Sequence, residues 1–206
     1  MARDVMQFDE DLVNPHNRYG WRDLEGPITV PSAGATRPVL ATYVGDIEDY
    51  VFDAGDHYGP LKFHIPHDYA RGTDMFIHTH WSHNGTNISG ALELNYNFIY
   101  AKGHNQAAFP ASQKTIAHAI SGLTLANTPA RQHRIDEIQL SIVGGGASLL
   151  DTNDIEVDGL ILMHFDVPTT PTITGGAAKP FIHYVDIHYL ADRYATRRRA
   201  PNFYED

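Results

Sequence analysis

The sequence predicts an all-β protein, an antiparallel β-sandwich with jelly-roll-like topology and an extended N-terminal arm. From residue 39 onward, apolar and polar residues alternate with a period of two, and β-branched and aromatic residues fill the alternating runs. Gly, Pro, Asn and Asp separate these runs, and no long amphipathic helix interrupts them. Two antiparallel sheets packed face to face satisfy such a pattern.

The predicted strands are short and irregularly spaced along the chain. The alternation is clearest in ALELNYNFIYA (91–101), where Leu92, Leu94 and Tyr96 share one face. Gly90 precedes this run and Gly103 and Asn105 follow it, as turn residues do in a sandwich with loops of unequal length. The other predicted strands span 39–44, 49–54, 61–65, 75–81, 113–120, 133–143, 159–167 and 181–190.

The first 38 residues differ from the rest of the chain because they contain four prolines and lack a clear period. Proline fixes φ and removes a backbone donor, so this segment suits an extended arm rather than a sheet interior. Its apolar side chains need a surface, either on the same chain or on a neighbouring subunit. The expected anchors are Phe8, Leu12, Tyr19, Trp21 and Leu24. We therefore divide the chain into an arm (1–38), a sandwich domain (39–192) and a C-terminal tail (193–206).

Composition excludes several classes of function. A length of 206 residues fits one domain with a substantial core. The absence of cysteine excludes thiolate nucleophiles, cysteine–zinc sites and disulfides. A net charge of −10 argues against nucleic-acid binding. No apolar run approaches the roughly 20 residues that cross a bilayer.

Histidines concentrate in GTDMFIHTHWSH (72–83), where the spacing Gly72-x5-His78-x-His80 reproduces the opening of the first cupin motif. Residues two apart on a strand share a face, so these two imidazoles can chelate zinc, iron or manganese. A cupin also needs a carboxylate soon after the second histidine, and here no acidic residue precedes Glu93. A cupin-like metal-binding enzyme that uses this pair is therefore an alternative interpretation, and a structural or adventitious metal ion at the same pair is another.

The favoured interpretation makes His78, His80 and His83 structural, with no metal, no other cofactor and no catalytic residue. Each imidazole offers one donor and one acceptor beside an apolar ring, which suits a half-buried polar sheet face. His183 and His188 have opposite parity along their strand, so we expect them on opposite faces. Such scattering is typical of structural use.

Two further patterns have both a structural and a functional interpretation. DTNDIEVDG (151–159) is rich in carboxylates but departs from the EF-hand register, so we interpret it as an acidic turn. Trp81, Tyr96 and Tyr100 would form a stacking platform for a carbohydrate or receptor if they were exposed. Aromatic residues on strands are more often part of the core.

Several segments resemble a family of proteins of similar length encoded by tailed bacteriophages and prophages. The family's core signature is a phrase like IPHDY-x-x-GTD-x-x-x-H-x-HW, followed by a long strand and a C-terminal D-x-HY strand. The resemblance covers most of the chain from about residue 19. It is carried by YGWRDLEG (19–26), FHIPHDYARGTDMFIHTHWSHNGTNISG (63–90), YAKGHNQAAFP (100–110), DGLILMHF (158–165) and FIHYVDIHY (181–189).

The resemblance implies a virion structural component without enzymatic activity. A capsid decoration (cement) protein is the expected role, because a short sandwich with an apolar arm suits clamping neighbouring capsomers. A tail or fibre-attachment component that binds a receptor is the alternative. The expected partners are copies of the same chain, as a homo-oligomer and specifically a trimer, and the major capsid protein or another virion protein. We expect synthesis in the host cytoplasm and a place on the capsid surface, with neither nucleic acid nor membrane as partner.

Overall fold

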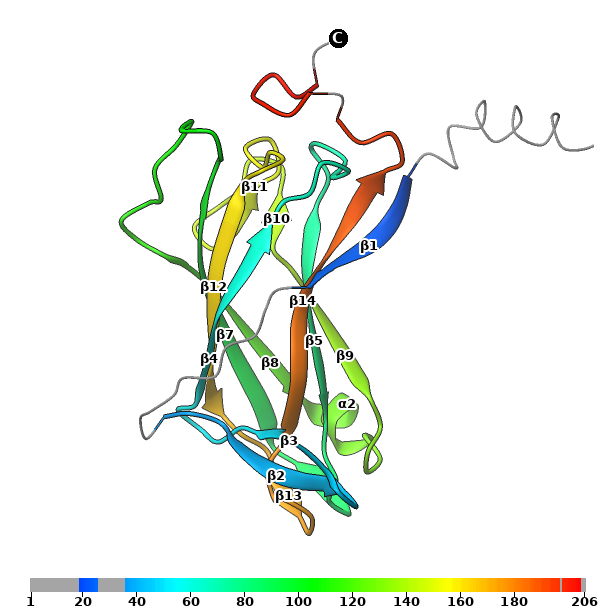
Figure 1. Cartoon of the computed structure of the whole chain (residues 1–206). Helices are drawn as coiled ribbons and strands as arrows, with labels where there is room; N and C mark the ends of the chain where they lie inside the picture. The colour runs from blue at the N-terminus through cyan, green and yellow to red at the C-terminus, as the bar shows by residue number, and fades with distance from the viewer. Residues whose placement is uncertain (1–18, 26–35, 197, 205–206) are drawn as a thin grey trace, which may run out of the picture.

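Two antiparallel sheets packed face to face form the structure, a computed structural model that describes residues 19–25, 36–196 and 198–204 (Figure 1). The larger sheet has six strands. Its central strand β14 pairs with β1 along its C-terminal half and with β3 at its first residue. The order is β2 (Val39–Val44), β3 (Ile47–Val51), β14 (Phe181–Asp192), β5 (Met75–Ser82) and β9 (Arg134–Gln139), with β1 (Tyr19–Glu25) beside β14.

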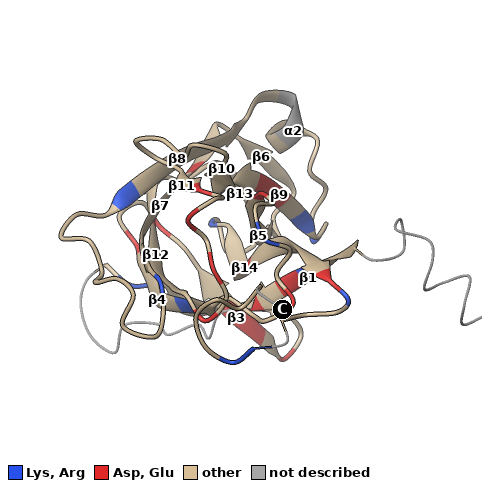
Figure 2. Ribbon diagram, turned by 90° about the horizontal axis from the view of Figure 1, so that it is seen from above, with Lys and Arg blue, Asp and Glu red and all other residues tan. Residues whose placement is uncertain are grey.

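The smaller sheet has four strands, and Figure 2 shows it facing the larger sheet. Its order is β4 (His57–His64), β12 (Leu160–Thr169), β7 (Ala91–Ala101) and β8 (Lys114–Ser121). Short elements complete the described part of the chain. They are the pair β10 (Ser141–Ile142) and β11 (Leu150–Asp151), the pair β6 (Asn87–Ser89) and β13 (Thr172–Thr174), and the helix α2 (Gly122–Ala126).

The order of the strands is that of a jelly roll. We number β3, β4, β5, β7, β8, β9, β12 and β14 from first to eighth. In these numbers the larger sheet runs first, eighth, third, sixth, and the smaller sheet runs second, seventh, fourth, fifth. Each of the two sheets therefore takes strands from both halves of the chain, as in two interleaved Greek keys. The predicted all-β sandwich is confirmed.

The core lies between the sheets, where the inward-facing residue of each alternating pair is buried. On β7, Leu92, Leu94 and Tyr96 are each 0% exposed, and the residues between them are partly exposed. The other central strands follow the same rule. Their buried residues include Met75, Ile77 and Trp81 on β5, Ile161, Met163 and Phe165 on β12, and Val185, Ile187 and Tyr189 on β14.

The N-terminal segment differs from its prediction. In place of an arm without strands, residues 19–25 form β1, which pairs with β14 in the antiparallel register from Tyr19↔Asp192 to Glu25↔Asp186. The physical reason is that the prolines of the segment lie outside this stretch, which therefore keeps every backbone donor. Leu24 packs against the core, and the Arg22 guanidinium donates to Asp68 at 2.6 Å.

The described part of the C-terminal tail packs on the sandwich. The backbone N–H of Thr196 donates to the His67 carbonyl at 2.9 Å. Phe203 is 1% exposed and joins the core cluster, with its ring edge-on to His67 at 5.7 Å. The described residues of the tail are thereby part of the folded domain.

Candidate functional site

The outer face of the larger sheet carries a row of histidines. On β5 the side chains of Phe76, His78 and His80 point away from the core, because the residues between them fill it. Strand β14 on one side and β9 on the other bring further polar side chains to the same face. His78 and His80, the pair predicted from the sequence, lie at its centre, with ring centroids 6.3 Å apart.

His78 is held through one ring nitrogen. Its Nε2 lies 2.8 Å from Oε2 of Glu137 on β9 and 3.1 Å from Nδ1 of His188 on β14. When Nε2–H donates to the glutamate, Nδ1 of the same neutral ring carries the lone pair. That Nδ1 faces Oδ1 of Asp186 at 3.8 Å.

His80 is held in the same manner but is more deeply buried, with a side chain 6% exposed. Its Nδ1 lies 2.8 Å from Nε2 of His133, and its ring stacks on Tyr184 with centroids 3.9 Å apart. Its Nε2 has no hydrogen-bond partner and lies 3.6 Å from Oδ1 of Asp186. Burial, together with the neighbouring histidines, lowers the pKa of His80 to about 4. The ring is therefore neutral near pH 7.

Asp186 is the third member of this arrangement. Its side chain is 3% exposed, and Oδ1 has no hydrogen-bond partner. Burial raises the pKa of this carboxyl to about 6, and the nearby His78 acts in the opposite direction. At neutral pH the group is thus largely a buried carboxylate with one unsatisfied oxygen, which is costly without a counter-charge.

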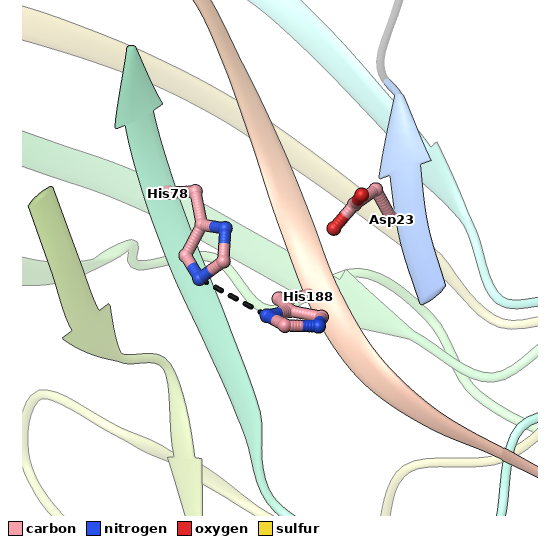
Figure 3. A group of neighbouring side chains, drawn as sticks. All are labelled: Asp23, His78 and His188. Atoms are coloured by element: carbon pink, nitrogen blue, oxygen red, sulfur yellow. Dashed lines mark hydrogen bonds between the residues drawn. The ribbon is translucent and has the colours of Figure 1, made fainter. Parts of the chain in front are cut away.

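Two sets of three side chains bring one potential ligand atom each within 4.8 Å of one another. One set is His78, His80 and Asp186, and the other is Asp23, His78 and His188. Figure 3 shows the second set, with Asp23 on β1 and His188 on β14 turned toward His78 on β5. Both sets share His78, and they join three strands of one sheet.

The predicted separation of His183 and His188 onto opposite faces is wrong. The register of β14 against β5 shifts between Ile182 and Tyr184, so parity is not kept along the strand. His183 consequently lies on the outer face. Its Nε2 is 2.9 Å from Oγ of Ser82, and its Nδ1 is 2.6 Å from Oδ2 of Asp49.

A second group of histidines surrounds Asp158, outside the row on the larger sheet. Nε2 of His64 and of His67 each lie 3.2 Å from Oδ1, and Nε2 of His104 lies 2.7 Å from Oδ2. Burial acts to raise the pKa of Asp158, but the hydrogen bond from His104 and the charges of His67 and His64 hold it below its ordinary value of 3.8. Every one of these contacts satisfies the carboxylate.

The remaining predicted site residues are separate from the row. His83 is 0% exposed in the loop after β5, and its Nε2 lies 2.8 Å from the carbonyl of Thr128. Of the expected arm anchors, Tyr19 and Trp21 are 47% and 54% exposed on β1. Phe8 and Leu12 lie outside the described residues.

The carbohydrate platform considered from the sequence is not present as an exposed surface. Trp81 and Tyr96 are both 0% exposed, since they face the core. Trp81 Nε1 donates to Asp136, and the Tyr96 hydroxyl pairs with Thr79 Oγ1 at 2.5 Å. The acidic turn is held from within, because Asp151 accepts from the backbone N–H groups of Gly144 and Asn153.

Neither the surface charge nor the hydropathy of the described residues points to a further binding site. Lys and Arg are scattered over the described strands and loops rather than gathered in one stripe (Figure 2). Within the described ranges, no helix has the length and apolar character to cross a bilayer. Comparison of the chain with family models, with curated proteins and with solved structures found no match.

The sequence analysis missed the residues of β14 and β1 that lie beside His78 and His80. Asp186 and His188 share parity on one predicted strand, as His78 and His80 do on another. That parity was available from the sequence, but the pairing of the two strands was not. Asp23 was missed because β1 was not predicted.

Proposed function

We propose that the protein is a non-enzymatic structural component of a phage virion, a capsid decoration protein. In this role it binds the outer surface of the head through its N-terminal segment and through contacts between copies. The observation that carries the proposal is the jelly-roll strand order, on a chain whose motifs resemble a phage family. Jelly rolls are common in viral coat proteins, where the sandwich supplies a rigid body.

The attachment surface that we propose begins at β1. This strand lies beside β14 and presents the rings of Tyr19 and Trp21 to solvent. The Trp21 ring is held edge-on against His188 at 4.8 Å and Phe76 at 5.9 Å, so it is positioned before any partner binds. Exposed, ordered aromatic side chains are typical binding hot spots.

The test uses full-length protein and phage heads that lack it. We expect full-length protein to co-sediment with the heads. Deletion of residues 1–18 should abolish this binding, and Trp21→Ala should weaken it by about tenfold or more, as at a hot spot. The matched control is Val143→Ala, at a side chain 67% exposed on a different part of the surface, which should bind like wild type.

Two results would contradict the proposal. One is full-length protein that stays in the supernatant with intact heads. The other is the shortened protein binding heads with full-length affinity. Cryo-electron microscopy of the intact particle then locates the protein, and density on the tail or fibre would favour the receptor-binding alternative.

A further inference from the structure

We propose that His78 Nδ1, His80 Nε2 and Asp186 Oδ1 bind one divalent transition-metal ion, with Zn²⁺ the best fit, which joins β5 to β14. This goes beyond the proposed function and replaces the expectation of metal-free structural histidines. It rests on where three ligand atoms point, on their burial and on their hydrogen-bond partners.

The spacing of Asp186 Oδ1 from the two imidazole nitrogens suits a tetrahedral ion. Oδ1 of Asp186 lies 3.8 Å from Nδ1 of His78 and 3.6 Å from Nε2 of His80. Zinc bonds of about 2.0–2.2 Å at tetrahedral angles place ligand atoms roughly 3.3–3.6 Å apart. These two separations therefore need to close by only a few tenths of an ångström, and one ligand atom of each of the three residues lies within 4.8 Å of the other two. Both are also too long for hydrogen bonds between the same atoms.

The chemistry of the three atoms suits a cation better than it suits the groups themselves. His80 Nε2 and Asp186 Oδ1 are buried, and neither has a hydrogen-bond partner. His78 Nδ1 carries a lone pair when its Nε2–H donates to Glu137. His80 Nε2 carries a lone pair when its Nδ1–H donates to His133. In these tautomers three electron-rich atoms face one another in a nearly dry site. A divalent ion satisfies all three at once.

The neighbours of the ligands form the outer shell that such sites require. Zinc-bound histidines usually hydrogen-bond through the second ring nitrogen to a carboxylate or another polar group. Here His78 Nε2 meets Glu137 at 2.8 Å, and His80 Nδ1 meets His133 at 2.8 Å. Both rings are thereby held in orientation before the ion binds.

The site suits a structural ion. Tyr184 covers the His80 ring by stacking on it, and Asp186 is 3% exposed. The ligands line none of three cavities found on the described part of the chain. Three protein ligands leave the fourth tetrahedral position to a water molecule, as in open zinc sites, so the burial of the ligands is what makes the ion structural here. The ion then adds a cross-link between two strands that already pair.

The experiment uses full-length protein, freed of metal by a chelator and titrated with Zn²⁺ alone. We expect one Zn²⁺ per chain by calorimetry and by elemental analysis, together with a Zn²⁺-dependent rise in Tm. Co²⁺ should give the visible absorption of a tetrahedral site in wild-type protein, a readout that needs no variant. Absence of one tightly bound equivalent in wild type would overturn the proposal.

Variants then assign the ligands. His80→Gln and Asp186→Asn should weaken Zn²⁺ binding at least 100-fold. Glu137→Gln, at a side chain 54% exposed where folding is not at risk, should weaken it by about 10- to 100-fold. The matched control is Asp158→Asn, in the other histidine–carboxylate group, which should bind Zn²⁺ like wild type.

Three results with these variants would overturn the ligand set. They are unchanged affinity in Asp186→Asn, unchanged affinity in Glu137→Gln, and loss of the ion in Asp158→Asn. Loss in His188→Gln with full binding in Asp186→Asn would also overturn it, and would assign the ion to Asp23, His78 and His188. All measurements use the free protein, so they are independent of capsid binding.

Discussion

At the scale of single residues, the histidines of this protein differ in what faces their ring nitrogens. His83 lies in a buried loop with its Nε2 at 2.8 Å from the Thr128 carbonyl, an arrangement that fixes the loop. His104 faces a carboxylate that two other histidines also satisfy. At His80, in contrast, a buried nitrogen faces a buried oxygen with no hydrogen bond between them. The group around Asp158 is complete in the protein alone. His83 leaves a buried Nδ1 without a hydrogen-bond partner, whereas at His80 two such atoms, its Nε2 and Oδ1 of Asp186, face each other.

The Asp158 group leads to a prediction about pH. The pKa of Asp158 is held below its ordinary value of 3.8, so its ionised form is favoured by folding. The stability that it contributes is fully present above pH 3.8 and is lost as the pH falls through the lower pKa of the folded state. We expect Asp158→Asn to lower the free energy of unfolding at pH 6 by about 1–3 kcal/mol. The difference from wild type should shrink in acid below about pH 4.

Urea unfolding of both proteins from pH 7 to pH 2.5 measures this difference. Asparagine tolerates the positive φ of 59° at this position, so the backbone is not the cause of the change. Asp154→Asn is the control, because that side chain is 73% exposed and should leave the profile unchanged. A difference between Asp158→Asn and wild type that stays constant into acid would contradict the assignment.

At the scale of elements, β1 assigns part of the predicted N-terminal arm to the sandwich itself. It covers one edge of β14 over seven residues, from Tyr19 to Glu25. Leu24 packs against the core, and the side chain of Arg22 bonds to Asp68. The boundary between arm and domain therefore matters for stability as well as for the proposed attachment.

Two deletions test the role of β1. Removal of residues 1–18 should leave the midpoint of thermal unfolding within a few degrees of wild type, because β1 remains. Removal of residues 1–25 exposes the edge of β14 and removes Leu24, whose burial contributes up to about 1.5–3 kcal/mol. We expect a clearly lower midpoint by circular dichroism for the second deletion only. Equal midpoints for both proteins would mean that β1 is not part of the stable fold.

At the scale of the whole molecule, we predict that contacts between copies form at the β2 edge of the larger sheet. The edge strand β2 and the neighbouring β3 expose several aliphatic side chains. Val39 and Leu40 are each 55% exposed, Val44 is 46% exposed and Ile47 is 61% exposed. An exposed apolar edge strand favours association, and self-association of one chain favours closed symmetry.

Sedimentation of the full-length protein tests this prediction. We expect a homo-oligomer, specifically a trimer, at micromolar concentration. The double variant Leu40→Ser/Ile47→Ser should dissociate into monomers without loss of fold, because both side chains are exposed. Val143→Ser, directly after β10 and 67% exposed, is the control and should leave the oligomer intact. Figure 1 shows β10 at the end of the molecule opposite β2. A wild-type monomer, or a double variant that stays associated, would contradict the prediction.

The sequence by itself determined the all-β class and the position of most strands. The predicted strands 39–44 and 91–101 have the bounds of β2 and β7, and the predicted strand 75–81 ends one residue before β5. These predictions succeed because side-chain alternation is a local property of a strand with one face in the core. The sequence also identified His78 and His80 as neighbours on one face, for the same reason.

Only the tertiary structure decided which strands lie side by side. His78 and His188 are 110 positions apart, and the contact between them exists because β5 pairs with β14. Because of the register shift between Ile182 and Tyr184, His183 lies on the outer face, although strict alternation predicts the opposite face. The strand β1 formed where the local pattern is weak, because β14 offered an edge with free backbone groups. Strand pairing is a property of the folded chain as a whole. No local pattern could therefore predict that Asp186, the proposed ligand, lies beside His80.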